Sequence, residues 1–169
     1  MAAGLKIFET VDVDAYKGAM GAVPSPVSIV TSYEDEQPHG TTVGAFMSLS
    51  LAPTMVLISL QKTSTLLPVL QRTERFGLNV LCAEQMEIAK QFSQRGIDRW
   101  AGIDWDLVEE VPRIAGDASF VACSVFQVMT SGDHVVITGM VHHAESATKP
   151  GLVYQHREFG RFVGEAPAV

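Results

Sequence analysis

The sequence is poor in the features that mark several large protein classes. It has 2 cysteines, Cys82 and Cys123, far apart in apolar runs, so neither a CxxC motif nor a disulfide framework is expected. Lysine and arginine number 12 against 19 acidic residues, and no basic cluster occurs, so we expect no nucleic acid partner. No apolar run reaches the roughly 18 residues of a membrane span, and no signal-peptide pattern opens the chain. We therefore expect a soluble, cytoplasmic protein with no membrane partner.

The motifs of common nucleotide-binding and hydrolytic sites are also missing. No G-x-G-x-x-G, G-x-x-x-x-G-K-[ST], H-E-x-x-H or G-x-S-x-G occurs in the chain. Of the 5 histidines, only His142 and His143 lie close together. Neighbouring residues of a strand point to opposite faces, so these two cannot share one ion, and no metal site is expected.

What the sequence has is apolar residues, at 47% against 18% charged. We expect a single domain over residues 1–169, with a core at about 13–163 and peripheral ends at 1–10 and 164–169. Two runs, 121–129 and 135–138, are apolar at successive positions, whereas a strand with one face in water should alternate. This surplus of apolar surface predicts a homodimer.

The periodicity predicts many strands and few, short helices. Helices are expected at 13–21, from Leu66 after Thr63–Thr65, and at 83–92, with a loop at 96–105. Strands are expected at 27–31, 39–44, 54–60, 76–81, 118–130, 134–144, 152–155 and 159–163. Regular strand–helix alternation is absent, so the predicted fold is mainly β, a closed or nearly closed antiparallel β-barrel.

Hydroxyl side chains concentrate in Thr41–Ser50 and again in Lys62–Thr65. Singly, threonines suit strands and serines suit turns. Together with a cation and the helix start near Ser64–Thr65, they weakly indicate a phosphorylated ligand. The tripeptide Gly132–His134 also has two interpretations, because glycine and aspartate are the ordinary residues of a hairpin turn.

Several segments in order resemble the short-chain flavin reductase family. They are Pro26–Thr31, Gly40–Pro53, Phe76–Leu81, Phe92, Asp98–Trp105 and Gly132–His134, and the resemblance runs from about Val13 to Phe162. The family has a split antiparallel β-barrel, forms homodimers, and binds FMN or FAD without a Rossmann domain. It supplies reduced flavin to separate monooxygenases.

The resemblance implies a flavin site in three segments. The flavin would lie along Thr42, Val43, Gly44, Ala45, Phe46, Met47, Ser48 and Ser50. Its phosphate would lie near Gln61, Lys62, Ser64 and Thr65, in agreement with the hydroxyl pattern. Phe92 and the loop that leads to Trp100 would flank the cofactor, although Phe92 equally fits the core face of a helix.

The resemblance also implies a nicotinamide site at Gly132, Asp133, His134 and Tyr154, with His134 as the catalytic residue. His134 is expected away from the hydroxyl-rich stretch, and Tyr154 also fits a buried position in a closing strand. Gln155–Arg157 departs from the family's basic-glycine turn, which leaves the adenine-side contacts open.

The function implied is that of an NAD(P)H:flavin oxidoreductase, in which hydride passes from nicotinamide C4 to flavin N5. Such chemistry belongs to the cofactors, which fits the absence of a hydrolytic motif. Two alternatives stay open: a flavin-dependent oxidase or monooxygenase acting on an organic substrate, and a non-catalytic flavin-binding protein. The residues do not choose between FMN and FAD or between NADH and NADPH.

Overall fold

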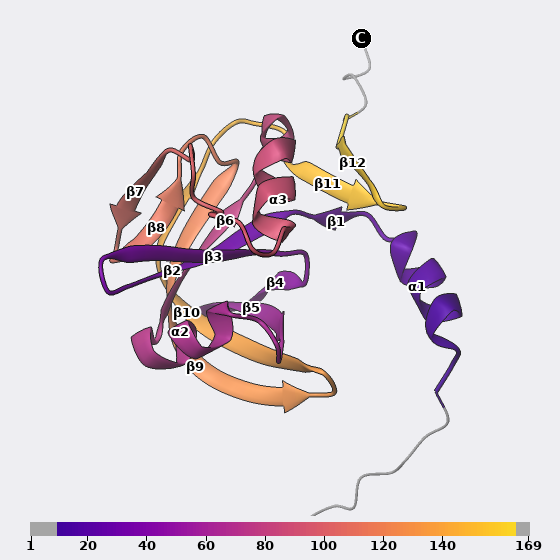
Figure 1. Ribbon diagram of the computed structural model, residues 1–169, viewed down its shortest axis with the longest axis horizontal. Coiled ribbons are helices and arrows are strands. Elements are labelled where there is room, and N and C mark those ends of the chain that lie inside the picture. The colour runs from indigo at the N-terminus through magenta and orange to yellow at the C-terminus, as the bar shows by residue number, and fades with distance from the viewer. Residues whose placement is uncertain (1–9, 165–169) are drawn as a thin grey trace, which may run out of the picture.

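The computed structural model describes residues 10–164, and antiparallel strands dominate it (Figure 1). The ends expected to be peripheral, 1–10 and 164–169, fall almost entirely outside these residues. The helices are α1 (Val13–Gly21), α2 (Leu66–Thr73), the short 3-10 helix η1 (Ala83–Gln85) and α3 (Met86–Ser93). The strands are β1 (Ser25–Pro26), β2 (Ser28–Glu34), β3 (Gln37–Val43), β4 (Phe46–Leu51), β5 (Thr54–Gln61), β6 (Arg75–Val80), β7 (Trp105–Val108), β8 (Val111–Ile114), β9 (Ser119–Ser131), β10 (His134–Ser146), β11 (Leu152–Gln155) and β12 (Glu158–Arg161).

Seven strands form one antiparallel sheet in the order β3-β2-β6-β9-β10-β5-β4. Its two edge strands, β3 and β4, follow each other in the chain and are separated by Gly44 and Ala45 alone. The main-chain nitrogen of Ser59 in β5 donates to the carbonyl oxygen of Ala45 at 2.9 Å, which holds this connection against the sheet. No ladder among the described residues joins β3 to β4. The predicted mainly β, split-barrel fold is confirmed, and the split lies where β3 passes into β4.

Two helices cover the sheet. Helix α2 buries Leu66, Leu67, Val69 and Leu70 in a core cluster with Val30, Ile58 and Phe76 of the strands. Helix α3 buries Ala89 and Phe92 against a second cluster that includes Ile29 and Leu81. Because both helices are amphipathic, each turns one apolar face to the sheet and leaves the other in water. Both helices contact β2 and β3, and β3 is the strand that ends at the split.

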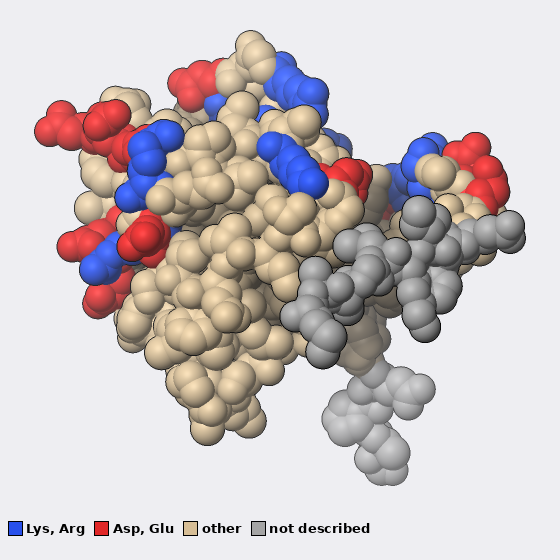
Figure 2. All heavy atoms as spheres, turned by 90° about the horizontal axis from the view of Figure 1, so that it is seen from below, with Lys and Arg blue, Asp and Glu red and all other residues tan. Residues whose placement is uncertain are grey.

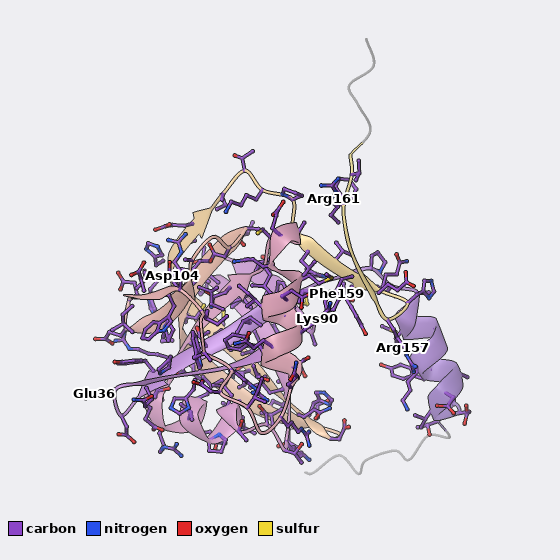
Figure 3. All side chains as sticks on the ribbon, turned by 45° about the horizontal axis from the view of Figure 1, so that its top comes forward. Glu36, Lys90, Asp104, Arg157, Phe159 and Arg161 are labelled. Carbon is purple, nitrogen blue, oxygen red and sulfur yellow. The ribbon has the colours of Figure 1, made fainter. Side chains whose placement is uncertain are left out.

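A second part of the molecule stands beside the barrel. It consists of α1 and the three-stranded sheet β1-β11-β12, which we call the arm (Figure 1). Phe159 of β12 packs against the α3 cluster at the foot of the arm, near Lys90 of α3 (Figure 3). Asp12 caps α1 by accepting from the main-chain nitrogens of Asp14 and Ala15 at 3.0 Å. Helix α1 buries no residue in this chain.

Between residues 10 and 164, no helix has the length and apolar character to span a bilayer.

Three features of the fold differ from the sequence-based expectation. The sequence predicts no strand at 46–51, where β4 lies, because these residues belong to the stretch interpreted as a ligand-binding segment. It also predicts no hairpin at β7–β8. The turn of that hairpin is Glu109–Glu110, with φ of 48° and 66°. Such left-handed turns normally contain glycine or asparagine, so the usual sequence signal is absent here. The helix expected at 83–92 is divided into η1 and α3.

Candidate functional site

An open cavity of about 790 Å³ lies at the split of the barrel. Its volume falls within the roughly 300–1,000 Å³ of small-molecule sites. One wall is β3 with the Gly44–Ala45 connection, and a second is the end of β5 with the turn that leads into α2. The third wall is the loop after α3, and His134 closes the space from β10. Polar groups from four separate segments therefore face one cavity.

Nine of the residues named from the sequence line this cavity. They are Thr42, Val43, Gly44, Ala45, Gln61, Ser64, Thr65, Trp100 and His134. They come from β3, the split, β5, the turn before α2, the loop after α3, and β10. The fold thus brings together residues that lie far apart in the sequence.

The other named residues lie outside the cavity wall of this chain. Phe46, Met47, Ser48 and Ser50 follow the split along β4, which leads away from it as an edge strand. Gly132 and Asp133 form the β9–β10 turn just behind His134. Tyr154 lies in the arm, where its ring packs on that of Phe159 with 4.9 Å between centroids. Lys62 and Phe92 are described below.

The hydroxyls of the turn before α2 are differently engaged. The Ser64 hydroxyl accepts from the main-chain nitrogen of Leu66 at 3.3 Å, so its own proton is free to be donated. Thr65, the N-cap residue, makes no side-chain capping bond. Thr42, by contrast, donates its hydroxyl to the carbonyl oxygen of Ala89 at 3.1 Å and so ties β3 to α3. The donors available to an anion are thus on the turn, at the start of α2.

His134 lies beside this turn, so its expected separation from the hydroxyl-rich stretch is wrong. In the β10–β5 ladder His134 is paired with Gln61, which brings its ring to the cavity that Ser64 and Thr65 also line. Sequence distance gave no hint of this pairing, since β5 and β10 become neighbours only in the sheet. His134 and the hydroxyls of the turn before α2 therefore line one continuous cavity.

Asp133 orients the His134 ring. The imidazole Nδ1 lies 2.8 Å from Asp133 Oδ1, and with the proton on Nδ1 it donates to the carboxylate. This hydrogen bond is the main reason why the pKa of Asp133 lies below its ordinary value. The ring nitrogen left for a ligand is then Nε2. Lys62 donates its main-chain nitrogen to the Asp133 carbonyl oxygen at 3.0 Å, and its charge also lowers the pKa of Asp133 slightly. Lys62 thus lies beside the β9–β10 turn and is not part of the cavity wall.

The Trp100 wall is fixed from both sides. Gln91 of α3 donates from Nε2 to the carbonyl oxygens of Arg99 and Ala101, at 3.0 and 2.9 Å. Arg99 donates from Nη1 to the Gly40 carbonyl oxygen at 3.0 Å. Phe92 is fully buried and meets Trp100 edge to face, with 5.0 Å between ring centroids. Phe92 therefore supports the wall from behind, as its helix-face interpretation required.

Sequence reasoning did not single out some lining residues, among them His39 and Ser59. Thr41 belongs to the hydroxyl-rich stretch, and Arg95, Ile97, Asp98 and Arg99 belong to the loop to Trp100 that the resemblance puts beside the cofactor. Thr41 and Thr42 both line the cavity although they are neighbours in β3, so strand alternation alone does not give the lining. Within the loop, no periodicity tells which side chains face inward.

Neither a metal-type cluster nor a cysteine lines the cavity among the residues that the structure describes. Between residues 10 and 164 no three His, Cys, Asp or Glu side chains gather as a metal site would require. Both cysteines are buried, and burial raises the pKa of the Cys123 thiol to about 12, so it stays protonated. The cavity offers main chain, hydroxyls, the imidazoles of His39 and His134, charged side chains of the loop after α3, and the indole of Trp100. These groups can bind and orient ligands, and the bond-making chemistry would have to come from what is bound.

By its fold and its cavity the protein is a ligand-binding split barrel. A family model described as a flavin reductase like domain matches residues 20–162. The chain belongs to this flavin reductase like family, as its sequence motifs indicated.

Individual relatives agree over most of the chain. The FMN reductase (NADH) SmoA of Agrobacterium fabrum is 33% identical over 149 residues, which cover 88% of this chain and 85% of that protein. The monooxygenase reductase subunit HsaB of Mycobacterium tuberculosis is 30% identical over 160 residues, covering 93% and 84%. The structure of the Streptomyces globisporus NADH:FAD oxidoreductase SgcE6 with NAD and FAD fragments is 30% identical, with a TM-score of 0.87 and coverage of 94% and 99%.

Some relatives are much longer. The reductase component of the trigonelline monooxygenase of Acinetobacter baylyi is 33% identical over 82% of this chain, but only 45% of that protein is covered. A probable flavin reductase of Rhizobium meliloti is covered over 48% of its length. The chain thus spans about half the length of these two relatives.

Proposed function

We propose that this protein is an NAD(P)H:flavin oxidoreductase that supplies reduced flavin to a separate monooxygenase. The observation that carries the proposal is the single cavity at the barrel split, shared by His134 and the hydroxyls of Ser64 and Thr65. Relatives named as FMN reductase and as a monooxygenase reductase subunit support the activity and the partner.

The residues present fit a flavin. Val43–Ala45 and Trp100 line the space available to a ring system, and Ser64 and Thr65 offer donors for its phosphate. When bound, flavin and nicotinamide supply the acceptor and the donor of the hydride. The work of the chain is to hold the two rings in contact, roughly 3–3.5 Å apart, and to keep water from between them. When both ring nitrogens carry a proton, Nε2 of His134 can donate to an oxygen of the nicotinamide nucleotide while Nδ1 donates to Asp133, which holds the ring in place.

Steady-state assays that cross NADH or NADPH with FMN or FAD test this function. We expect flavin-dependent oxidation of at least one nicotinamide nucleotide, with reduced flavin released into solution. Turnover of an organic substrate with flavin retained would instead support a flavin-dependent oxidase or monooxygenase. Flavin binding without any oxidation of NADH or NADPH would support a non-catalytic flavin-binding protein.

A homodimer is the proposed assembly, and the outer face of the sheet supports it. Val135 and Ile137 of β10 point into the core, so Val136, Thr138 and Met140 point outward. The ladders place uncharged side chains around these three: Met47, Met55, Leu57, Ser59, Ser124, Gln127 and Met129. We call these ten residues the methionine face. Figure 2, a view from below, likewise shows charged side chains gathered elsewhere and a broad uncharged area in its lower half.

One further observation favours a second copy. Helix α1 has nine residues, exposes Val13, Tyr16 and Met20, and buries none in its own chain. A helix of this length is marginal alone, so a packing surface on another copy would stabilise it. An obligate interface of this kind buries more than about 2,000 Å².

Substituting one residue of the methionine face should break the dimer. Met129 is 61% exposed in the single chain, and Met129→Lys would place an unpaired charge inside the interface, which costs several kcal/mol, at least about 3. Light scattering should then show a monomer at micromolar concentration, where the parent chain is dimeric. Leu107→Lys is the matched control, since Leu107 of β7 is also half exposed, at 50%, but lies outside this face. A parent chain that is monomeric and binds flavin would contradict the proposed dimer.

A cytoplasmic location is also proposed. Both cysteines are unpaired and buried, which suits a compartment that keeps thiols reduced.

A further inference from the structure

Three aromatic side chains that can lose an electron lie in a row beside the cavity. The rings of Trp100 and Trp105 have 5.6 Å between centroids at an interplanar angle of 66°, and those of Trp105 and Tyr33 have 6.0 Å at 51°. The row contains both tryptophans of the sequence and one of its 3 tyrosines. Tilted and edge-on contacts of this kind stabilise packing. Tryptophan and tyrosine are also the aromatic side chains that are most readily oxidised.

The row begins in the cavity and leads away from it. Trp100 lines the cavity, and among residues 10–164 it is the only tryptophan or tyrosine that does so. Phe92 contacts the Trp100 ring from another side, with 5.0 Å between centroids, but a phenylalanine ring is much harder to oxidise. Within the described part of the chain, an electron vacancy formed on Trp100 therefore has one readily oxidised aromatic neighbour, Trp105.

The far end of the row is in contact with solvent. Trp105 opens β7, and the β7–β8 hairpin packs on β2, the strand that carries Tyr33 (Figure 1). The Tyr33 hydroxyl has no hydrogen-bond partner between residues 10 and 164 and is not shielded from solvent. A phenol that loses an electron also loses its proton. Water at the Tyr33 hydroxyl can accept that proton, so the vacancy can come to rest there.

We propose that Trp100, Trp105 and Tyr33 form a light-driven one-electron path between a flavin in the cavity and the protein surface. Trp100 gives an electron to the light-excited flavin, Trp105 refills the vacancy on Trp100, and Tyr33 refills that on Trp105. Tyr33 releases its phenolic proton to water. The flavin has then gained one electron, and a neutral tyrosyl radical and one proton have formed. Return of the electron and the proton restores the starting state.

The inference rests on the proposed function only for its cofactor. It requires a flavin next to Trp100, but neither a nicotinamide nucleotide nor a monooxygenase takes part.

The row matters because the electron can also return directly. Electron transfer between two rings weakens steeply with distance, so a vacancy that stays on Trp100 is soon refilled from the adjacent flavin. Each step toward Tyr33 increases the separation, and loss of the phenolic proton traps the vacancy at the end of the row. The path therefore predicts a long-lived tyrosyl radical, which aromatic packing alone would not produce.

Flash spectroscopy on the flavin-loaded protein tests the path, without oxygen or nicotinamide nucleotide. In the parent chain we expect quenched flavin fluorescence and, after the flash, a tyrosyl radical detected by transient absorption and electron paramagnetic resonance. Trp100→Phe should lengthen the fluorescence lifetime severalfold and abolish the radical. Trp105→Phe and Tyr33→Phe should leave the fluorescence quenched, because Trp100 is still present, and should abolish the tyrosyl radical. Circular dichroism and flavin titration establish that each variant is folded and loaded.

Tyr16→Phe is the matched control, because Tyr16 is a 57% exposed tyrosine of α1 that lies outside the row. It should keep both the quenching and the radical. A parent chain without the radical would overturn the proposal, as would unchanged fluorescence in Trp100→Phe, a parental radical yield in Trp105→Phe, or loss of the radical in Tyr16→Phe. If Trp105→Phe does not fold, Tyr33→Phe decides, since it removes a single hydroxyl. Failure of the proposed function looks different, because NADH and NADPH would then stay unoxidised whatever the response to light.

Discussion

Gly40→Val should destabilise the protein and abolish tight flavin binding in one step. Gly40 is buried in β3, and an added Cβ would lie 2.8 Å from Cε1 of Phe92 and 3.2 Å from Cζ2 of Trp100. Trp100 lines the cavity, Phe92 supports it from behind, and neither ring is the end of a flexible side chain. Overpacking of this kind costs about 1–3 kcal/mol, and the two branched methyl groups of valine add to it. Displacing Trp100 would at the same time distort the site.

Chemical denaturation and flavin titration of the same samples check this expectation. Gly18→Ala is the control, because a Cβ at Gly18 of α1 meets nothing within 4 Å. In a helix alanine is preferred to glycine by about 1 kcal/mol, so this variant should be as stable as the parent or slightly more so. A Gly40→Val protein with parental stability and parental flavin affinity would show that the wall is not packed as described.

His134→Ala should lower kcat/KM for the nicotinamide nucleotide by about tenfold or more, the value of one hydrogen bond to a charged group. The structure gives the reason: His134 is held by Asp133 at 2.8 Å and lines the cavity with its other ring nitrogen available. Because the ring is also close to Gln61 and the phosphate-binding turn, flavin affinity must be measured separately. We expect it to stay near the parental value.

Asp133→Asn provides the graded comparison for His134→Ala. The amide keeps the shape of the side chain but removes the charge that orients the imidazole, so the loss in kcat/KM should be smaller. If His134→Ala loses flavin binding, and hydride transfer corrected for flavin occupancy is unchanged, then His134 serves the flavin and its assignment to nicotinamide is wrong.

Most of the fold could be predicted because its strands carry local signals. The two long strands β9 and β10, for example, are β-rich and joined by a glycine-containing turn. The hairpin β7–β8 was invisible because Glu109 and Glu110 occupy left-handed positions without the residues that usually mark them. Strand β4 was hidden for another reason, since its serines suited a binding segment as well as an exposed edge strand.

The sequence names the residues that line the cavity best where the chain forms regular elements and carries recognisable motifs. The family resemblance named Thr42–Ala45, and the hydroxyls at a helix start also indicated the Ser64–Thr65 turn; both segments line the cavity, and their binding role stays a prediction. The pairing of His134 with Gln61 depends on which strands become neighbours in the sheet, and no local pattern encodes that. The loop to Trp100 was put beside the cofactor only by the resemblance, because an irregular segment has no periodicity that tells which of its side chains face the cavity.

Anaerobic mixing of the flavin-loaded protein with NADH or NADPH tests the central claim most directly, because no oxygenase, oxygen or organic substrate is involved. The account predicts rapid bleaching of the flavin absorbance with at least one of the two nucleotides, and stoichiometric oxidation of that nucleotide. A flavin that binds in the cavity and stays oxidised with both nucleotides would contradict it.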